Sequence, residues 1–215
     1  MSIKAVLKNI LQAIPLIPEP QHPSYQTNGL HIRWKLGWLR AQVIYRPYWT
    51  LLAKMNLAPK IIWGKRVSFL SPIVVFGNGT ISFGDDTIFD SVPNIFTHHP
   101  AAKINIGANC FINGSRIASY VSINIGANCI LANCRMMDTD FHSVTKNRLS
   151  PKALVQTAPI QIDQNVWIAA DAAILKGVHI GENSVIAFGS VVVKSIPENS
   201  IAGGNPAKVI SSIPE

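Results

Sequence analysis

Residues 162–197 decide the fold, and read in sixes they are IDQNVW, IAADAA, ILKGVH, IGENSV, IAFGSV and VVKSIP. Each hexapeptide begins with Ile or Val, and the fifth position is mostly small. The fourth position is Asn, Asp or Gly in five of the six, and these residues best tolerate a positive φ. An aliphatic residue and a turn residue that recur every six positions predict the rungs of a parallel β-helix. Neither a helical period of about 3.6 nor simple alternation produces this pattern.

The same period extends back, less regularly, to about residue 61. The apolar residues six apart are Ile61, Val67 and Ile73; Phe83, Phe89 and Ile95; Ile106 and Ile112; and Ile125, Leu131 and Met137. Breaks at 97–100, 118–124 and 138–159 predict insertions that project from corners of the solenoid. The longest insertion is polar and precedes the strictest part of the repeat, so we expect the chemistry there.

The basic character of the chain belongs to its N-terminal part. The net charge is +8, but residues 1–66 hold ten Lys and Arg against one acid, whereas residues 67–215 hold nine against ten. A basic, aromatic-rich segment can cover the open end of a repeat array or lie on an anionic membrane surface. No recognised nucleic-acid-binding motif accompanies it, so we expect no nucleic-acid partner.

Two regions follow from this change in composition. Residues 1–60 are predicted to be a helical and irregular cap, and residues 61–215 a β-helix domain. Within the cap, helical spacing of aliphatic residues predicts an amphipathic helix over residues 1–14. Residues 30–58 read as helical pieces broken at Pro47.

The cysteines and the apolar runs indicate the compartment. The three cysteines, Cys110, Cys129 and Cys134, cannot all pair with one another, and nothing indicates a disulfide framework. Cys110 and Cys129 fall at the small fifth position, so we expect them to be buried apolar thiols. Lysines interrupt any signal-peptide core near the N-terminus, and no uncharged apolar run is long enough to span a bilayer. We therefore expect a cytoplasmic protein, with peripheral contact to the inner face of the membrane through residues 1–66.

Six short segments, four of them within residues 162–197, together resemble those of a known protein family. They are DTDFH at 138–142, IDQNVWI at 162–168, IGENSVI at 180–186, GS at 189–190, KSIP at 194–197 and GNPAKVI at 204–210. With these, residues 106–210 resemble the hexapeptide-repeat acyltransferases, and specifically the sugar O-acetyltransferase branch. That branch includes maltose and galactoside acetyltransferases and exopolysaccharide or lipopolysaccharide acetyltransferases. The resemblance covers about half of the chain.

The resemblance implies an all-β fold, a left-handed parallel β-helix of triangular section with three hexapeptides per coil. Residues 162–179 and 180–197 would then be two full coils. The hand does not follow from the period, because left-handed crossovers are the exception among parallel strands. The resemblance also implies a homotrimer with active sites between neighbouring subunits.

His142 matches the catalytic histidine of the family. A sugar hydroxyl is a poor nucleophile at neutral pH, and an imidazole can take its proton as the oxygen attacks a thioester carbonyl. Asp138 or Asp140 could orient the ring, but both could instead be turn residues. Without the motif, a solvated loop histidine would be the simpler interpretation.

The resemblance places acetyl-CoA in a groove beside the last coils, and no metal is expected. The matching cofactor-binding positions are Ala170, Phe188, Val193, Lys194 and Lys208. The two lysines can pair with phosphates, whereas Phe188 and Val193 are equally explained by packing. Trp167 either packs against neighbouring side chains or forms the wall of the groove at its thioester end.

On the acceptor side, Asn113 resembles an asparagine that contacts the sugar, although it could merely shape a turn. The nearby acidic residue of the family is replaced by Ser119 and Tyr120, which argues against maltose-like or galactoside-like recognition. We therefore expect transfer of acetyl from acetyl-CoA to a hydroxyl of a sugar or lipid-linked glycan, in cell-surface polysaccharide biosynthesis.

Other functions remain open at this point. Transfer to the amine of an amino sugar would use the same fold and donor. A zinc carbonic anhydrase with this fold needs three histidine ligands at a subunit interface, and the spacing of the histidines here does not match. The third alternative is a non-catalytic scaffold, which would have no use for His142 and the two lysines.

Overall fold

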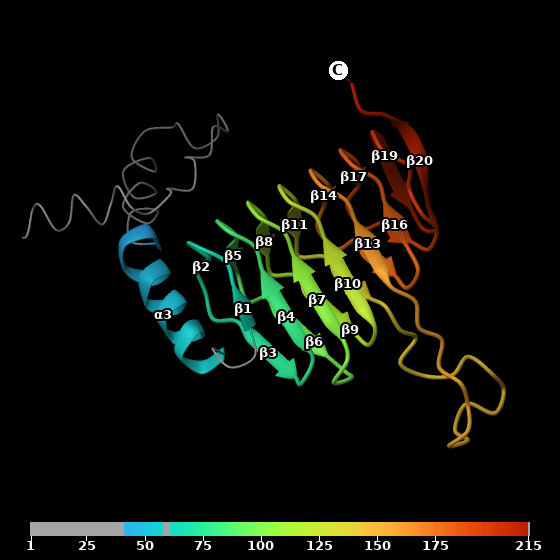
Figure 1. Ribbon diagram of the computed structural model, residues 1–215. Coiled ribbons are helices and arrows are strands. Elements are labelled where there is room, and N and C mark those ends of the chain that lie inside the picture. Colours follow the sequence, from blue (N-terminus) through green and yellow to red (C-terminus); the bar gives the residue numbers. More distant parts are fainter. Residues whose placement is uncertain (1–40, 58–60, 215) are drawn as a thin grey trace, which may run out of the picture.

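The computed structural model describes residues 41–57 and 61–214, and the second range folds into a three-sided β-helix (Figure 1). Sheet A consists of β1 (Ile61–Trp63), β4 (Thr80–Phe83), β7 (Lys103–Ile106), β10 (Ser122–Ile125), β13 (Ile160–Ile162) and β16 (His179–Ile180). Sheet B consists of β2 (Ser68–Phe69), β5 (Ile88–Asp90), β8 (Phe111–Asn113), β11 (Ile130–Ala132), β14 (Trp167–Ile168), β17 (Val185–Ile186), β19 (Ser200–Gly204) and β20 (Ala207–Ser212). Sheet C consists of β3 (Val74–Gly77), β6 (Asn94–Thr97), β9 (Arg116–Ser119), β12 (Arg135–Met137), β15 (Ala173–Leu175) and β18 (Val191–Val192).

Each coil contributes one strand to each sheet, so β1, β2 and β3 form the first coil and β16, β17 and β18 the sixth. Neighbouring strands are parallel, except that β20 turns back antiparallel on β19. In the regular part, Ile162 pairs with Ile180, Ile168 with Ile186, and Ile174 with Val192. These partners occupy equivalent positions of the coils 162–179 and 180–197. The predicted left-handed parallel β-helix is therefore confirmed.

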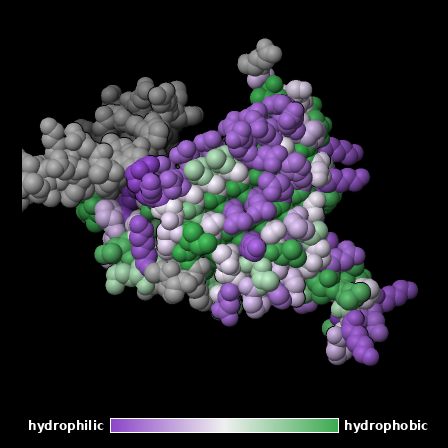
Figure 2. Space-filling model, viewed as in Figure 1, coloured by the Kyte–Doolittle hydropathy of each residue, from purple (hydrophilic) through white to green (hydrophobic). Residues whose placement is uncertain are grey.

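The predicted insertions leave the solenoid at one edge. We name each corner by the sheets it joins, so the chain passes from sheet C to sheet A at the CA corner. Residues 98–102 follow β6, residues 120–121 follow β9, and residues 138–159 follow β12, all at this corner. The last insertion, which we call the 138–159 loop, projects from the body at the lower right of Figures 1 and 2.

The turn residues adopt the backbone conformation that the repeat predicts. φ is 55° at Asn165, 59° at Asp171, 76° at Gly177, 59° at Asn183 and 66° at Gly189. At the AB corner the asparagine side chains also form a ladder. Asn165 Nδ2 donates to Asn183 Oδ1 at 2.9 Å, and Asn183 Nδ2 donates to Asn199 Oδ1 at 2.9 Å. These turn residues thus stabilise the corner twice, through their φ and through hydrogen bonds between coils.

The interior is filled by apolar side chains that stack from coil to coil. Ile162, Ile168 and Ile180 have no solvent exposure. The first coils use aromatic residues instead, and the rings of Phe69 and Phe89 stack with centroids 4.7 Å apart. Full burial of one such side chain contributes about 1.5–3 kcal/mol, so the aliphatic repeat is the main source of stability.

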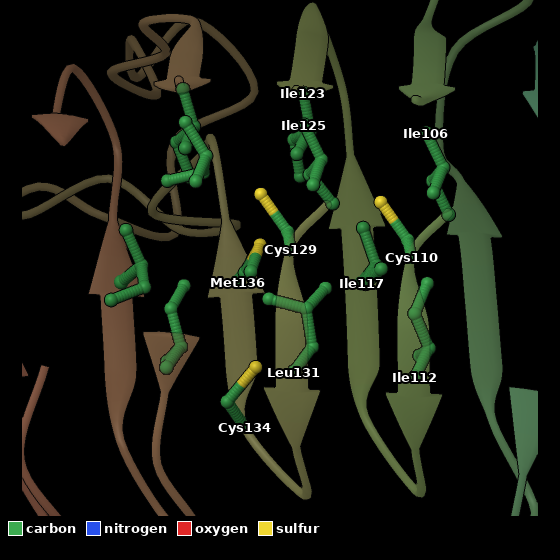
Figure 3. Close-up of a cluster of buried hydrophobic side chains, with 14 of the residues drawn as sticks. Ile106, Cys110, Ile112, Ile117, Ile123, Ile125, Cys129, Leu131, Cys134 and Met136 are labelled. Atoms are coloured by element: carbon green, nitrogen blue, oxygen red, sulfur yellow. The ribbon is translucent and has the colours of Figure 1, made fainter. Parts of the chain in front are cut away.

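The three cysteines are free and buried among these aliphatic residues, as the sequence predicted for Cys110 and Cys129 (Figure 3). A hydrogen bond with Cys129, together with burial, raises the pKa of the Cys110 thiol. Burial raises the pKa of the Cys134 thiol to about 11. Since a thiol reacts as its thiolate, Cys110 and Cys134 are packing residues and not nucleophiles.

A helix covers the N-terminal end of the solenoid. A π-helical turn (η2, Ala41–Tyr45) leads into α3 (Arg46–Leu57), which lies against the first coil (Figure 1). The Phe69 amide donates to Thr50 Oγ1 at 2.8 Å, and Ala53 is buried in the core. This contact favours the capping interpretation of the segment.

Two helical pieces are observed as predicted, and the change from η2 to α3 falls between Tyr45 and Arg46, just before Pro47. Pro47 is the second residue of α3, where its missing N–H costs little. Residues 30–40 of that prediction lie outside the described residues. The predicted helix over residues 1–14 lies outside the described residues, and the division at residue 60 stays a prediction. No helix in the described ranges is long and apolar enough to cross a membrane.

Candidate active site

Asp138 fixes the first end of the 138–159 loop. Its carboxylate has no solvent exposure and accepts hydrogen bonds from the Ser119 hydroxyl at 2.8 Å and from the amides of Tyr120 and Val121 at 2.6 and 2.8 Å. A buried carboxylate needs such partners. Asp138 therefore ties the loop to the insertion of the preceding coil, and its role is structural.

Asp140 and Lys176 form a second attachment. Lys176 Nζ lies 2.7 Å from Asp140 Oδ1, and both side chains are about three-quarters buried. Lys176 follows β15, so this ion pair joins the loop to the next coil. The His142 amide donates to the Asp140 carbonyl at 2.6 Å, which closes a tight turn before the histidine.

The orienting role considered for Asp138 or Asp140 is therefore not observed. Within the described residues, neither carboxylate forms a hydrogen bond with the imidazole of His142. The two carboxylates hold the backbone of the loop and leave the ring exposed. An exposed imidazole on an anchored backbone is suited to accept a proton from a bound hydroxyl.

The residue before the histidine adopts an unusual conformation. Phe141 has φ of 57°, a region that aromatic residues seldom occupy. Its ring packs edge-on against His98, with centroids 4.8 Å apart, and His98 in turn stacks on Phe96 at 6.0 Å. The ring contact with His98 compensates for the backbone strain and sets the direction in which the chain reaches His142.

Two of the predicted cofactor residues lie at the BC corner. The Gly189 amide donates to the Ala170 carbonyl at 3.0 Å, so the turn that contains Phe188 lies directly on the turn that contains Ala170. The Phe188 side chain is 72% exposed. Phe188 therefore does not pack inside this chain, and its ring is free to contact a ligand or another subunit.

The other predicted cofactor residues lie at the C-terminal end. Val193 and Lys194 follow β18 at the CA corner, and Val193 is 43% exposed, so it does not belong to the core. Lys208 lies on β20, which contacts β18. Both ammonium groups are on exposed residues, where they can meet the phosphates of a long ligand.

Asn113 ends β8 at the BC corner. Its carbonyl accepts from the Asn133 amide at 2.5 Å and from the Ser115 hydroxyl at 3.3 Å, so its backbone shapes a turn as one interpretation required. Along one chain, Asn113, Ala170 and Phe188 thus share the BC corner. His142, Val193 and Lys194 share the CA corner, on the other side of sheet C.

Three features of the site were not predicted from the sequence. The Lys176–Asp140 ion pair, the ring contact of His98 with Phe141 and the bonds from Tyr120 and Val121 to Asp138 all join different coils. In the sequence, the only indication of these three contacts is that each involves a residue in or next to a break in the hexapeptide repeat. Among residues 41–57 and 61–214, no three His, Cys, Asp or Glu side chains lie close enough together to hold a metal ion.

Comparison with known families places the chain. Residues 159–194 match the model "Bacterial transferase hexapeptide (six repeats)", and residues 103–133 match "Hexapeptide repeat of succinyl-transferase". A Schizosaccharomyces pombe protein named "Putative acetyltransferase C18B11.09c" is 32% identical over 176 residues, which cover 74% of this chain and 72% of that protein. The chain belongs to the hexapeptide-repeat acyltransferase family.

Other members of the family match more locally. "Putative acetyltransferase YJL218W" of Saccharomyces cerevisiae is 53% identical over 64 residues, which cover 30% of this chain and only 33% of that protein. The high identity is therefore confined to a short segment. The prediction of an acyltransferase is confirmed at the level of the family.

Two solved structures share the fold. The N-acyltransferase AntD from Bacillus cereus, solved in complex with coenzyme A, superimposes with a TM-score of 0.65 at 18% identity, and covers 76% of this chain and 90% of its own. The polysialic acid O-acetyltransferase OatWY gives a TM-score of 0.58 at 22% identity, with coverage of 72% and 82%. At these identities the likeness is one of fold.

Proposed function

We propose that this protein transfers an acetyl group from acetyl-CoA to a hydroxyl of a sugar, with His142 as the general base. The observation that carries the proposal is the double attachment of the 138–159 loop. Asp138 and Lys176 fix its backbone to two coils, while the imidazole stays exposed. Such anchoring holds a base in position without blocking it.

In the proposed reaction, His142 accepts the proton of the acceptor hydroxyl as the oxygen attacks the thioester carbonyl. The C–S bond then breaks, and the thiolate of CoA leaves and takes up a proton. Ala170, Phe188 and Val193 would lie along the pantetheine arm, and Lys194 and Lys208 would pair with phosphates. The complex of AntD with coenzyme A supports a CoA donor for this fold.

We further propose a homotrimer, because one chain divides the predicted site between two corners. The outward residues of sheet B form an unbroken apolar column in register: Ile88, Phe111, Ile130, Trp167, Val185 and Ile201. Ile130 and Trp167 are 46% and 48% exposed. An apolar surface of this extent favours contact with another subunit. A neighbour that packs on sheet B with its own CA corner would bring its His142 toward the BC corner of this chain, where Asn113, Ala170 and Phe188 lie.

The 138–159 loop supports the same arrangement. Leu149 is 94% exposed and Leu154 is 84% exposed, and Figure 2 shows hydrophobic residues on this projection. Leucines so exposed in a single chain gain stability when a second chain covers them.

We also propose that the acceptor sugar belongs to a cell-surface polysaccharide. The fold that this chain shares with OatWY, a polysialic acid O-acetyltransferase, is consistent with an acceptor of that kind. The cytoplasmic location, with the basic N-terminal segment at the membrane, is part of this proposal. A basic segment near an anionic membrane surface would bring the enzyme to an acceptor carried on a lipid.

The test is release of free CoA thiol from acetyl-CoA with a panel of sugars and amino sugars, followed by NMR location of the new ester or amide. His142→Ala should lower kcat by at least about a hundredfold, as expected for loss of a general base. His179→Ala is the matched control, because His179 is an exposed histidine on sheet A whose ring pairs with Asp163 and not with the 138–159 loop. Equal thiol release from both variants would remove His142 from the mechanism, and an amide product would replace the hydroxyl acceptor by an amine.

A further inference from the structure

Two arginines lie next to each other on the outward face of sheet C. Arg116 on β9 and Arg135 on β12 are direct partners in the parallel register, and both are exposed. Adjacent strands are about 4.8 Å apart, so the two side chains rise from neighbouring positions. Asn94 precedes this pair in the same column and Ala173 follows it, so the positive charge is confined to two coils.

In the described part of the chain, neither Arg116 nor Arg135 forms a salt bridge with a carboxylate. The salt bridges observed there join Arg66 to Asp86 and Lys176 to Asp140, and His179 Nε2 lies 2.7 Å from Asp163 Oδ2. Like charges directly opposite each other on neighbouring strands are destabilising. The two arginines are neighbours in register, and each guanidinium carries several N–H donors that suit the oxygens of a carboxylate or phosphate.

A series of contacts between aromatic rings runs from Arg116 to the 138–159 loop. The Arg116 guanidinium lies 4.8 Å from the centroid of Phe96, which stacks on His98, which contacts Phe141, the residue before His142. The contact with Phe96 holds Arg116 on the side of sheet C that faces the CA corner. A saccharide bound with an acidic group on the arginines would therefore extend along these rings toward His142.

We infer that Arg116 and Arg135 bind the carboxylate or phosphate of an acidic saccharide acceptor. This rests on the proposed function and adds the chemical class of the acceptor. The pair is not needed for the phosphates of the donor, because Lys194 and Lys208 lie at the C-terminal end of the solenoid, two or more coils away.

Direct binding tests the inference without relying on catalysis. Calorimetric titrations would use trigalacturonic acid for the carboxylate, mannose 6-phosphate for the phosphate, and galactotriose as the neutral control, each at low and high salt. Wild type should bind at least one acidic probe at least about tenfold more tightly than galactotriose, and more weakly at high salt. The double variant Arg116→Ala/Arg135→Ala should lose this preference.

Lys103→Ala is the matched control, because Lys103 is an exposed cation of the same coil as Arg116 but lies on sheet A. It should keep the preference, and circular dichroism should show that the double variant is folded. Equal binding of acidic and neutral probes by wild type, or an unchanged preference in the double variant, would overturn the inference. Acid-selective binding without His142-dependent thiol release would instead leave the inference standing and refute the proposed function.

Discussion

Sheets A and B line the same apolar interior, but their outward-facing residues differ in polarity. Both place branched aliphatic side chains inward in every regular coil, such as Ile162 in sheet A and Ile168 in sheet B. The outward column of sheet A begins with Ile62 in the first coil and is polar from the second coil on, where its partners in register are Ser82, Asn105, Asn124, Gln161 and His179. The outward column of sheet B is the apolar series that contains Ile130 and Trp167.

The difference teaches that the repeat constrains only half of each strand. Inward residues are fixed by the need to stack on the coil above and the coil below. Outward residues are free of that need, so their polarity reports what each face meets. On sheet A, hydrogen bonds link Ser82 to Asn105 at 2.7 Å and Asn105 to Asn124 at 2.8 Å, and Figure 2 shows hydrophilic residues over the middle of this face. The outward face of sheet A is therefore suited to contact with solvent, whereas the outward face of sheet B is suited to contact with another protein surface.

The largest expected effects concern the shared interior. Ile162→Ala and Ile168→Ala should each lower the free energy of unfolding by about 2–5 kcal/mol, because each leaves a cavity in a fully buried position. Urea unfolding measures both. A cost near zero for one sheet and several kcal/mol for the other would show that the two interiors are not equivalent.

The next effect separates the two exteriors. Trp167→Glu should dissociate the proposed trimer, with a loss of about 2–4 kcal/mol of association free energy, because it places a charge in the apolar column. Gln161→Glu introduces the same charge in the same coil on sheet A and should leave the assembly intact. Sedimentation velocity distinguishes these results, and a monomeric wild type or a trimeric Trp167→Glu would contradict the assignment of sheet B.

A smaller effect is expected at the corner between the two sheets. Asn183→Ala should cost about 1–2 kcal/mol, since alanine is strained at φ of 59° and both hydrogen bonds of the ladder are lost. Asn183→Gly keeps the backbone conformation and should cost less. Thermal unfolding compares the two variants, and an equal loss for both would assign the whole effect to the ladder.

The smallest effect belongs to the exposed ion pair of sheet A. Asp163→Asn removes the partner of His179, whose Nε2 lies 2.7 Å from Asp163 Oδ2. Because the His179 side chain is 53% exposed, the loss should stay below about 1 kcal/mol in urea unfolding. A larger loss would mean that the polar face contributes to the fold as much as the core does.

Much of the fold was predictable because its signal is local. The hexapeptide period located the strands, the turn residues such as Asn183 and Gly189, and the buried positions of Cys110 and Cys129. Pro47 located the change between two helical pieces to within two residues, because proline is tolerated in the first turn of a helix. The hand of the helix came from the resemblance and not from the period.

The site was less predictable because its contacts cross between coils of unequal length. Arg116 and Arg135 are partners in the parallel register although their separation in sequence is not a multiple of six. Asp140 reaches Lys176 across the whole 138–159 loop. Residue identity pointed to His142, but nothing in the sequence showed that the Asp138 carboxylate would be occupied by the amides of Tyr120 and Val121.

By itself the sequence determined the rung, since an aliphatic residue every sixth position has only one way to be buried along a solenoid. It also marked where the rung is interrupted and which histidine stands in the longest interruption. Only the tertiary structure decided that the interruptions share one corner, that two arginines become neighbours, and that one face is apolar and another polar. The reason is that stacking sets the register between coils, and register depends on every insertion that precedes it.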